Sequence, residues 1–171
     1  MKRKLIISAV AIISLVGISI AGSKLYNPYP NFPKEMEKEC LIAYNLVGSD
    51  PSYKPKFEKC IEESAKMDEK QGNYERAYDT LEALGDVRFS EEDYDNAERY
   101  FLKALEDVKK MKDKEAEALV YTQLGDVYVE KGDMEKAKDY YIKAYSDYKA
   151  IGKQMDAKLV LEFKLEKLDE S

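Results

Sequence analysis

The sequence predicts an all-α fold of stacked antiparallel helix pairs, and two observations carry this prediction. The stretch "LGDVRFSEEDYDNAERYFLKA", which begins at Leu84, returns 40 residues later as "LGDVYVEKGDMEKAKDYYIKA", which begins at Leu124. When residues 81–111 are set against residues 121–151, 11 of the 31 pairs are identical. Within each copy, apolar residues recur every three or four positions, as they do on one face of a helix. Self-similarity at such a period is typical of helix-pair solenoids.

The repeat also predicts where the helix pairs lie. The two clear copies predict pairs at about residues 74–111 and 114–151, each interrupted by a polar turn, "SEED" or "EKGD". A weaker copy upstream predicts a third pair at about residues 34–71. After the last pair, one more helix is expected at about residues 154–170, because a solenoid needs a polar element to close its core. The helical domain is therefore predicted to span residues 34–171.

In the closing helix, the leucine spacing predicts which side faces the core. Leu161, Leu165 and Leu168 are expected to face inward, with charged residues between them facing water.

Small residues in each copy predict close packing within a pair. Gly85 and Gly125 have no side chain, so another helix can approach closely there. Phe101 and Tyr141 are expected to fill the volume beside them. The residues predicted to pack the repeats together are Leu84, Gly85, Ala97, Phe101, Ala104, Leu124, Gly125, Ala137, Tyr141 and Ala144.

This pattern resembles the tetratricopeptide repeat, whose signature is a large residue, then Leu-Gly, Tyr, Ala and an aromatic residue. The sequence differs from the family in its period of 40 rather than 34, in the missing terminal Pro, and in Arg88 at the place of the Tyr. The resemblance implies a TPR-like solenoid of about three antiparallel helix pairs with a C-terminal capping helix, and it implies protein binding. The signature positions are Leu81, Leu84, Gly85, Arg88, Ala97 and Phe101 in one copy, and Tyr121, Leu124, Gly125, Tyr128, Ala137 and Tyr141 in the next.

The resemblance also implies a binding groove, because in this family the first helix of each pair lines the concave face. The corresponding surface here is acidic and partly apolar, so we expect a protein partner that is basic or apolar at the contact. The expected groove residues are Asp79, Glu82, Asp86, Phe89, Leu119, Thr122, Gln123, Asp126 and Val129.

The composition argues against several other functions. The chain has no His, which removes the commonest general base and metal ligand. No nucleophile–base pair, phosphate-binding loop or metal-ligand cluster is readable, so we expect no catalytic residue, metal or cofactor. Without the three N-terminal cations, 25 positive side chains stand against 34 negative ones, which disfavours nucleic-acid binding. The alternative to a protein-binding function is that of a secreted helical-repeat enzyme or small-ligand-binding protein.

Residues 1–23 predict an N-terminal transmembrane or signal helix. Three cations at positions 2–4 precede the uncharged run at residues 5–22, which as a helix would be roughly 27 Å long. That length approaches a hydrocarbon core of about 30 Å and favours an uncleaved single-pass anchor. Signal cleavage followed by secretion is the alternative. In either case the cations keep the N-terminus in the cytoplasm and the body lies outside, after a Pro-rich tether at residues 24–33.

Two further features leave alternatives open. Cys40 and Cys60 form a candidate disulfide if the body is exported, or are two separate buried thiols. Tyrosines crowd the second helix of the last pair, from Tyr140 to Tyr148, and provide either an interaction surface or simple packing.

Overall fold

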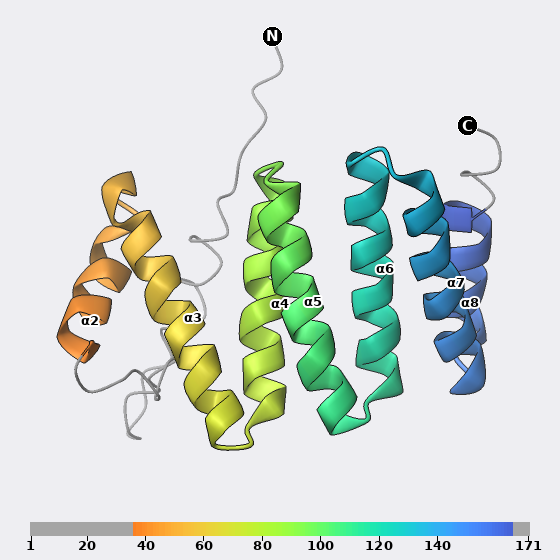
Figure 1. The fold of residues 1–171 in the computed structure, drawn as a ribbon, viewed down its shortest axis with the longest axis horizontal. Helices are drawn as coiled ribbons and strands as arrows, with labels where there is room; N and C mark the ends of the chain where they lie inside the picture. The colour runs from red at the N-terminus through yellow and green to blue at the C-terminus, as the bar shows by residue number, and fades with distance from the viewer. Residues whose placement is uncertain (1–35, 166–171) are drawn as a thin grey trace, which may run out of the picture. The chain divides into compact units, whose positions relative to one another are not determined.

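The computed structural model describes residues 36–165, and every regular element in this range is a helix (Figure 1). The predicted all-α class is confirmed for these residues. The chain forms two compact units, one ending at Ser64 and the other beginning at Ala65. The elements are α2 (Glu37–Leu46), the 3-10 helix η1 (Pro51–Tyr53), α3 (Lys54–Lys70), α4 (Tyr74–Ser90), α5 (Tyr94–Met111), α6 (Lys114–Glu130), α7 (Met134–Ala150), α8 (Gln154–Val160) and the π-helix η2 (Leu161–Leu165).

The predicted N-terminal segments lie outside the described range. These are the anchor or signal segment at residues 1–23, with its apolar run at 5–22, and the tether at residues 24–33. Within residues 36–165, no helix combines the length and the apolar character that crossing a membrane requires.

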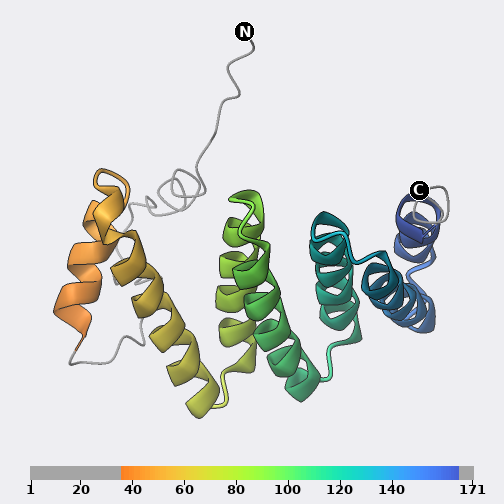
Figure 2. The ribbon, with the colours of Figure 1, turned by 45° about the horizontal axis from the view of Figure 1, so that its top comes forward.

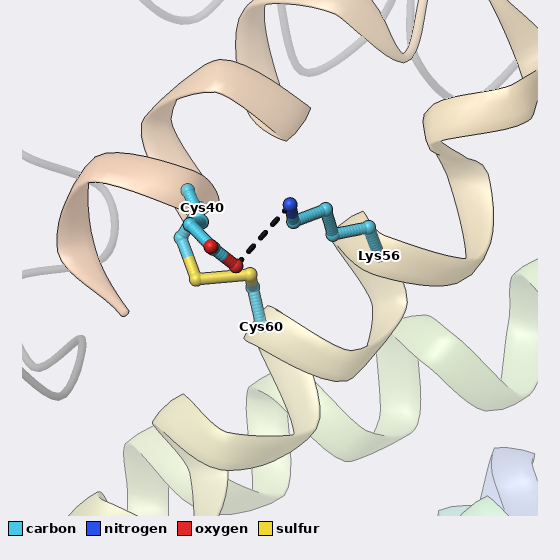
Figure 3. The surroundings of a disulfide bond; sticks show 4 residues. Cys40, Lys56 and Cys60 are labelled. Carbon is cyan, nitrogen blue, oxygen red and sulfur yellow. Dashed lines mark ion pairs between the residues drawn. A yellow bond between two sulfur atoms is a disulfide. The ribbon is translucent and has the colours of Figure 1, made fainter. Parts of the chain in front are cut away.

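The first unit contains α2, η1 and the first part of α3. Pro51 starts η1 and the Asp50 side chain accepts a hydrogen bond of 2.9 Å from the Ser52 backbone N–H, which fixes the turn between the two helices. The rings of Tyr44 and Phe57 approach to 6.2 Å between centroids. A disulfide joins Cys40 on α2 to Cys60 on α3 (Figure 3).

The second unit places the repeated sequence in two antiparallel helix pairs. Helix α4 packs on α5, α5 on α6, α6 on α7, and α7 on α8 with η2, as Figures 1 and 2 show. All ten residues that the sequence assigned to repeat packing are buried. The largest apolar side chains of this core include Phe101, Leu124 and Tyr141.

Each pair is closed by an aromatic ring lying on a glycine. A Cβ atom added to Gly85 would lie 2.5 Å from Cε1 of Phe101, and one added to Gly125 would lie 2.5 Å from Cδ1 of Tyr141. The close approach at these glycines therefore involves the ring of the second helix rather than its backbone. Since Phe101 and Tyr141 lie 16 residues after their glycines, the same contact is repeated in both copies.

The turns that end the helices require a left-handed residue. Gly72, Gly132 and Gly152 have φ between 78° and 79°, a conformation that glycine adopts without steric cost. In the turn between α4 and α5 the equivalent residue is Glu92, with φ of 62°. Helices α5, α6 and α7 are each preceded by an aspartate whose side chain accepts hydrogen bonds from backbone N–H groups of the first turn. These capping residues are Asp93, Asp113 and Asp133.

The closing segment differs from its sequence prediction. Leu165 is buried, but Leu161 is 38% exposed, so the prediction that Leu161 faces inward is wrong; Leu168 lies outside the described range. The inward side is formed by Ala157, Val160 and Leu165. The expected spacing fails because residues 161–165 form a π-helix, in which Leu165, five residues after Val160, takes the inward side.

Candidate functional site

The candidate binding surface is the exposed side of α4 and α6, called here the α4–α6 face. Its nine residues are those that the sequence assigned to the groove. On α4, Asp79, Glu82 and Asp86 are spaced three and four residues apart and therefore share one helix face. None of the ion pairs formed within residues 36–165 joins any of these three carboxylates to a lysine or arginine. This part of the face therefore presents negative charge that no described cation neutralises.

Gln123 connects the two helices of the face. Its amide Nε2 donates hydrogen bonds to Glu82 Oε1 at 2.9 Å and to Asp86 Oδ1 at 3.1 Å. The amide is neutral, so it orients the two carboxylates without cancelling their charge. The other amide atom, Oε1, is buried and accepts no hydrogen bond. The contact links Gln123 to two carboxylates that lie 41 and 37 positions earlier in the sequence.

The equivalent carboxylate of the second copy is neutralised. Asp126, 40 residues after Asp86, accepts hydrogen bonds at Oδ1 from the Tyr141 hydroxyl and from the Lys164 ammonium, each at 2.5 Å. Lys164 belongs to η2, so the closing segment supplies a cation to the face. The two copies therefore differ in chemistry: Asp86 meets a neutral amide, and Asp126 meets a cation and a hydroxyl.

This difference appears in the pKa values of the α4 carboxyls. Loss of hydration raises the pKa of Asp86 to about 6, and the nearby Glu82 carboxylate adds to the rise, although the Gln123 hydrogen bond opposes it. The pKa of Asp79 is also raised, first by loss of hydration and then by repulsion from Glu75 and Glu82. Tyr78, beside these carboxylates, has its hydroxyl pKa raised chiefly by burial. An incoming cation would relieve the repulsion between these groups.

The remaining face residues are apolar or weakly polar. Phe89 packs its ring against Tyr94 at 5.6 Å, and Val129 is half-buried against the core. Thr122 donates its hydroxyl hydrogen to the Ala118 carbonyl at 3.0 Å. Leu119 is 39% exposed, so it is the main apolar group that this face offers to solvent.

The surface changes character from α4 to α8. Leu119 on α6 stands 40 residues after Asp79, and Leu159 on α8 stands 40 residues after Leu119. Leu159 is 47% exposed. An ion pair of 2.5 Å between Lys153 and Glu115 ties the start of α8 to the start of α6. The same register position is therefore acidic on α4 and apolar on α6 and α8.

The tyrosines of α7 mainly serve packing. Tyr141 and Tyr148 are buried. Tyr140 is half-buried and stacks on Tyr128 with ring centroids 5.5 Å apart and planes 9° apart. The ammonium of Lys143 lies 4.7 Å from the centre of the Tyr140 ring. These contacts favour the packing alternative for this helix.

The described side chains do not suggest a metal centre. In residues 36–165, no group of three or more His, Cys, Asp and Glu side chains is arranged to hold a metal ion. The acidic stretches of the turns instead cap helices, as Asp93 and Asp113 do. The arrangement on the α4–α6 face suits the binding of a cationic or apolar group.

Sequence reasoning missed Lys164 as part of this surface. The repeat period indicated only that α8 corresponds to α6, the first helix of the preceding pair, because Gln154 stands 40 residues after Lys114. A helix in this position is expected to contact the first helix of the preceding pair, as Gln123 on α6 contacts α4. The charge that Lys164 brings to Asp126 followed from no periodic pattern.

Comparison with known proteins agrees with this geometry. Residues 76–150 match the family model described as tetratricopeptide repeat. This segment covers most of α4 and all of α5, α6 and α7. No curated protein matches the chain.

Proposed function

We propose that the chain is a protein–protein interaction module, because residues 76–150 match the tetratricopeptide-repeat model and such repeats generally bind other proteins. The observation that carries the proposal is the row of carboxylates on α4 with no described cation partner. The partner then presents lysine or arginine side chains to Asp79, Glu82 and Asp86. Charge complementarity of this kind speeds association and excludes acidic competitors.

The apolar part of the surface defines the rest of the partner. Leu119 and Leu159 occupy the same register position as Asp79 and are both exposed. A bound segment that lies across α4, α6 and α8 would therefore place cationic side chains over α4 and apolar side chains over α6 and α8. Asp126 is already neutralised by Lys164, so the cationic contact belongs to α4.

A charge-neutralising variant tests this surface. Asp79→Asn with Asp86→Asn removes two negative charges and adds no bulk. The matched control is Glu135→Gln with Asp139→Asn, which removes two exposed charges from α7. The full chain, immobilised, is used to capture proteins from detergent-solubilised membranes of its source cells at low and high salt, followed by mass spectrometry.

We expect one stoichiometric protein to be recovered with the wild type and the control but depleted with the α4 variant, most clearly at low salt where charges are least screened. Equal recovery with all three proteins would exclude the α4–α6 face as the binding surface. Recovery of no stoichiometric protein, together with turnover of a small substrate, would favour the enzyme alternative instead.

We also propose that the module is tethered to a membrane with its body outside the cytoplasm, as an accessory or assembly subunit of a membrane or envelope complex. Support comes from the cation-flanked apolar run at residues 5–22 and from the Cys40–Cys60 disulfide, since disulfides persist in oxidising compartments. Intact mass of the purified protein and protease access in whole cells test the proposal. A mature chain that begins near Gly22 would show that the segment is cleaved and the protein secreted rather than anchored. A body protected from external protease would show that it lies on the cytoplasmic side.

A further inference from the structure

The first unit has a helix that is weakly held by ordinary packing. Helix α2 has 10 residues, and isolated helices shorter than about 12–15 residues are marginal in water. Met36, at the N-cap position before the helix, provides no side-chain cap, and no basic residue lies in the last turn of the helix. The helix therefore depends on contacts with the rest of its unit.

Those contacts bury little apolar surface. The buried residues of α2 are Cys40 and Ala43, and alanine contributes only one methyl group. The larger apolar side chains Leu41 and Ile42 are 44% and 41% exposed. An ion pair of 3.2 Å joins Glu39 to Lys56, and both side chains are exposed, so its contribution is small (Figure 3).

The disulfide is the strongest link between α2 and α3. Cys40 and Cys60 are 0% and 1% exposed and lie 20 residues apart in sequence. Closing a loop of this length removes much of the freedom of the unfolded segment and so favours the docked helix. The second unit contains no cysteine and has its own apolar core, which includes Leu124 and Tyr141.

We infer that the disulfide makes α2 part of the folded protein, so that α2 is docked in the oxidised chain and released in the reduced chain, while the repeats of the second unit stay folded in both. Release begins with thiol–disulfide exchange: a dithiol reductant becomes a cyclic disulfide, and the Cys40–Cys60 bond takes up two electrons and two protons to give two thiols. The first unit is thereby sensitive to redox conditions and the second is not. The inference is independent of the proposed partner surface.

Amide hydrogen exchange of the full chain, followed by mass spectrometry, tests the inference. In the variant Cys40→Ala with Cys60→Ala, we expect exchange of peptides within residues 37–46 to accelerate on the order of 100-fold. Peptides from α6 and α7 should exchange as in the wild type. The control Lys56→Ala removes the ion pair to Glu39 and should change α2 exchange by no more than roughly threefold.

A second measurement avoids any packing defect of the alanine variant. Wild-type protein is reduced with dithiothreitol and treated with iodoacetamide. Both thiols should be alkylated as fast as those of an unstructured peptide, since release of α2 exposes them. Unchanged exchange of residues 37–46, or slow alkylation of the reduced chain, would overturn the inference. Faster exchange throughout α6 and α7 would overturn it too, because the disulfide would then hold the whole chain.

Discussion

At the scale of single residues, the two glycines Gly85 and Gly125 set how closely the helices of each pair approach. The ring of Phe101 or Tyr141 occupies the space that a Cβ atom would need. We expect Gly85→Ala to lower the free energy of unfolding by about 1–3 kcal/mol, because the added methyl group overpacks the contact. Urea melts at constant pH measure the loss.

The Phe101→Leu background provides the control for this prediction. A smaller, flexible side chain leaves room for the methyl group, so the cost of Gly85→Ala should fall to less than half there. The double-mutant cycle isolates this coupling. An equal cost in both backgrounds would show that the ring does not limit the approach.

A second residue-scale prediction follows from the difference between Asp86 and Asp126. Gln123→Lys would give Asp86 the kind of cation that Lys164 gives Asp126. We expect this substitution to raise the free energy of unfolding by about 0.5–1 kcal/mol at pH 8, an amount limited by solvent screening. Gln123→Met serves as the uncharged control and should not stabilise. A lysine variant no more stable than the methionine variant would refute the expected ion pair.

The raised pKa of Asp86 predicts how stability changes with pH. The folded-state pKa of about 6 lies above the usual aspartate pKa of 3.8, so the fold favours the protonated carboxyl. The stability that this group contributes is full below about pH 4 and is lost as the pH rises through 6. The Asp86→Asn variant has no carboxyl to deprotonate here, so it does not lose this stability. Its free energy of unfolding should therefore rise relative to that of the wild type between pH 4 and pH 8.

Urea melts of wild type and Asp86→Asn at several pH values check the sign. Asp139→Asn on α7 is the control, since it removes an exposed carboxylate from the second helix of a pair. A stability difference between wild type and Asp86→Asn that stays constant from pH 4 to pH 8 would contradict the prediction.

At the scale of helices, the turn after α4 differs from the related turns by one residue. Glu92 adopts the left-handed conformation that Gly72, Gly132 and Gly152 adopt elsewhere. We expect Glu92→Gly to stabilise the protein by about 0.5–1 kcal/mol, because a side chain is disfavoured in this conformation. The neighbouring Glu91, with φ of −89°, provides the matched control. Glu91→Gly should destabilise, and a similar effect of both substitutions in thermal melts would rule out the backbone explanation.

The sequence could predict α4 to α7 because two similar copies constrain each other. An apolar or small residue that recurs at the same place in both copies has one explanation in common, which is burial between the same helices. Ala97 and Ala137 or Ala104 and Ala144 are examples, and all four are fully buried. Periodicity also placed the carboxylates of α4 on one face.

The closing segment and the links between helices were not predictable in the same way. The π-helix at residues 161–165 breaks the 3.6-residue period on which the expected orientation of Leu161 depended. The bond of Gln123 to two carboxylates and that of Lys164 to Asp126 depend on how neighbouring helices are placed in space. Such contacts leave no spacing pattern in the sequence, because each partner is also an ordinary exposed polar residue.

At the scale of the whole molecule, the described residues combine a repeat unit and a unit that carries the disulfide. The repeats follow from sequence self-similarity and provide the surface proposed for binding. The described residues of the first unit bury fewer apolar side chains, and a disulfide on α2 links this helix to α3. The chain thus stabilises its two units by different means.

The disulfide has a mechanical consequence. Tension applied to the two ends of the oxidised chain passes from Cys40 directly to Cys60, so the residues between them carry none of it. Twenty residues extend to at most about 3.3–3.6 Å each, so the oxidised chain should reach a contour length roughly 60 Å shorter than the reduced chain. Optical-tweezers stretching with and without dithiothreitol measures this difference. If the N-terminus is held in a membrane, a pulling partner would load the repeats while the covalent loop around η1 stays slack.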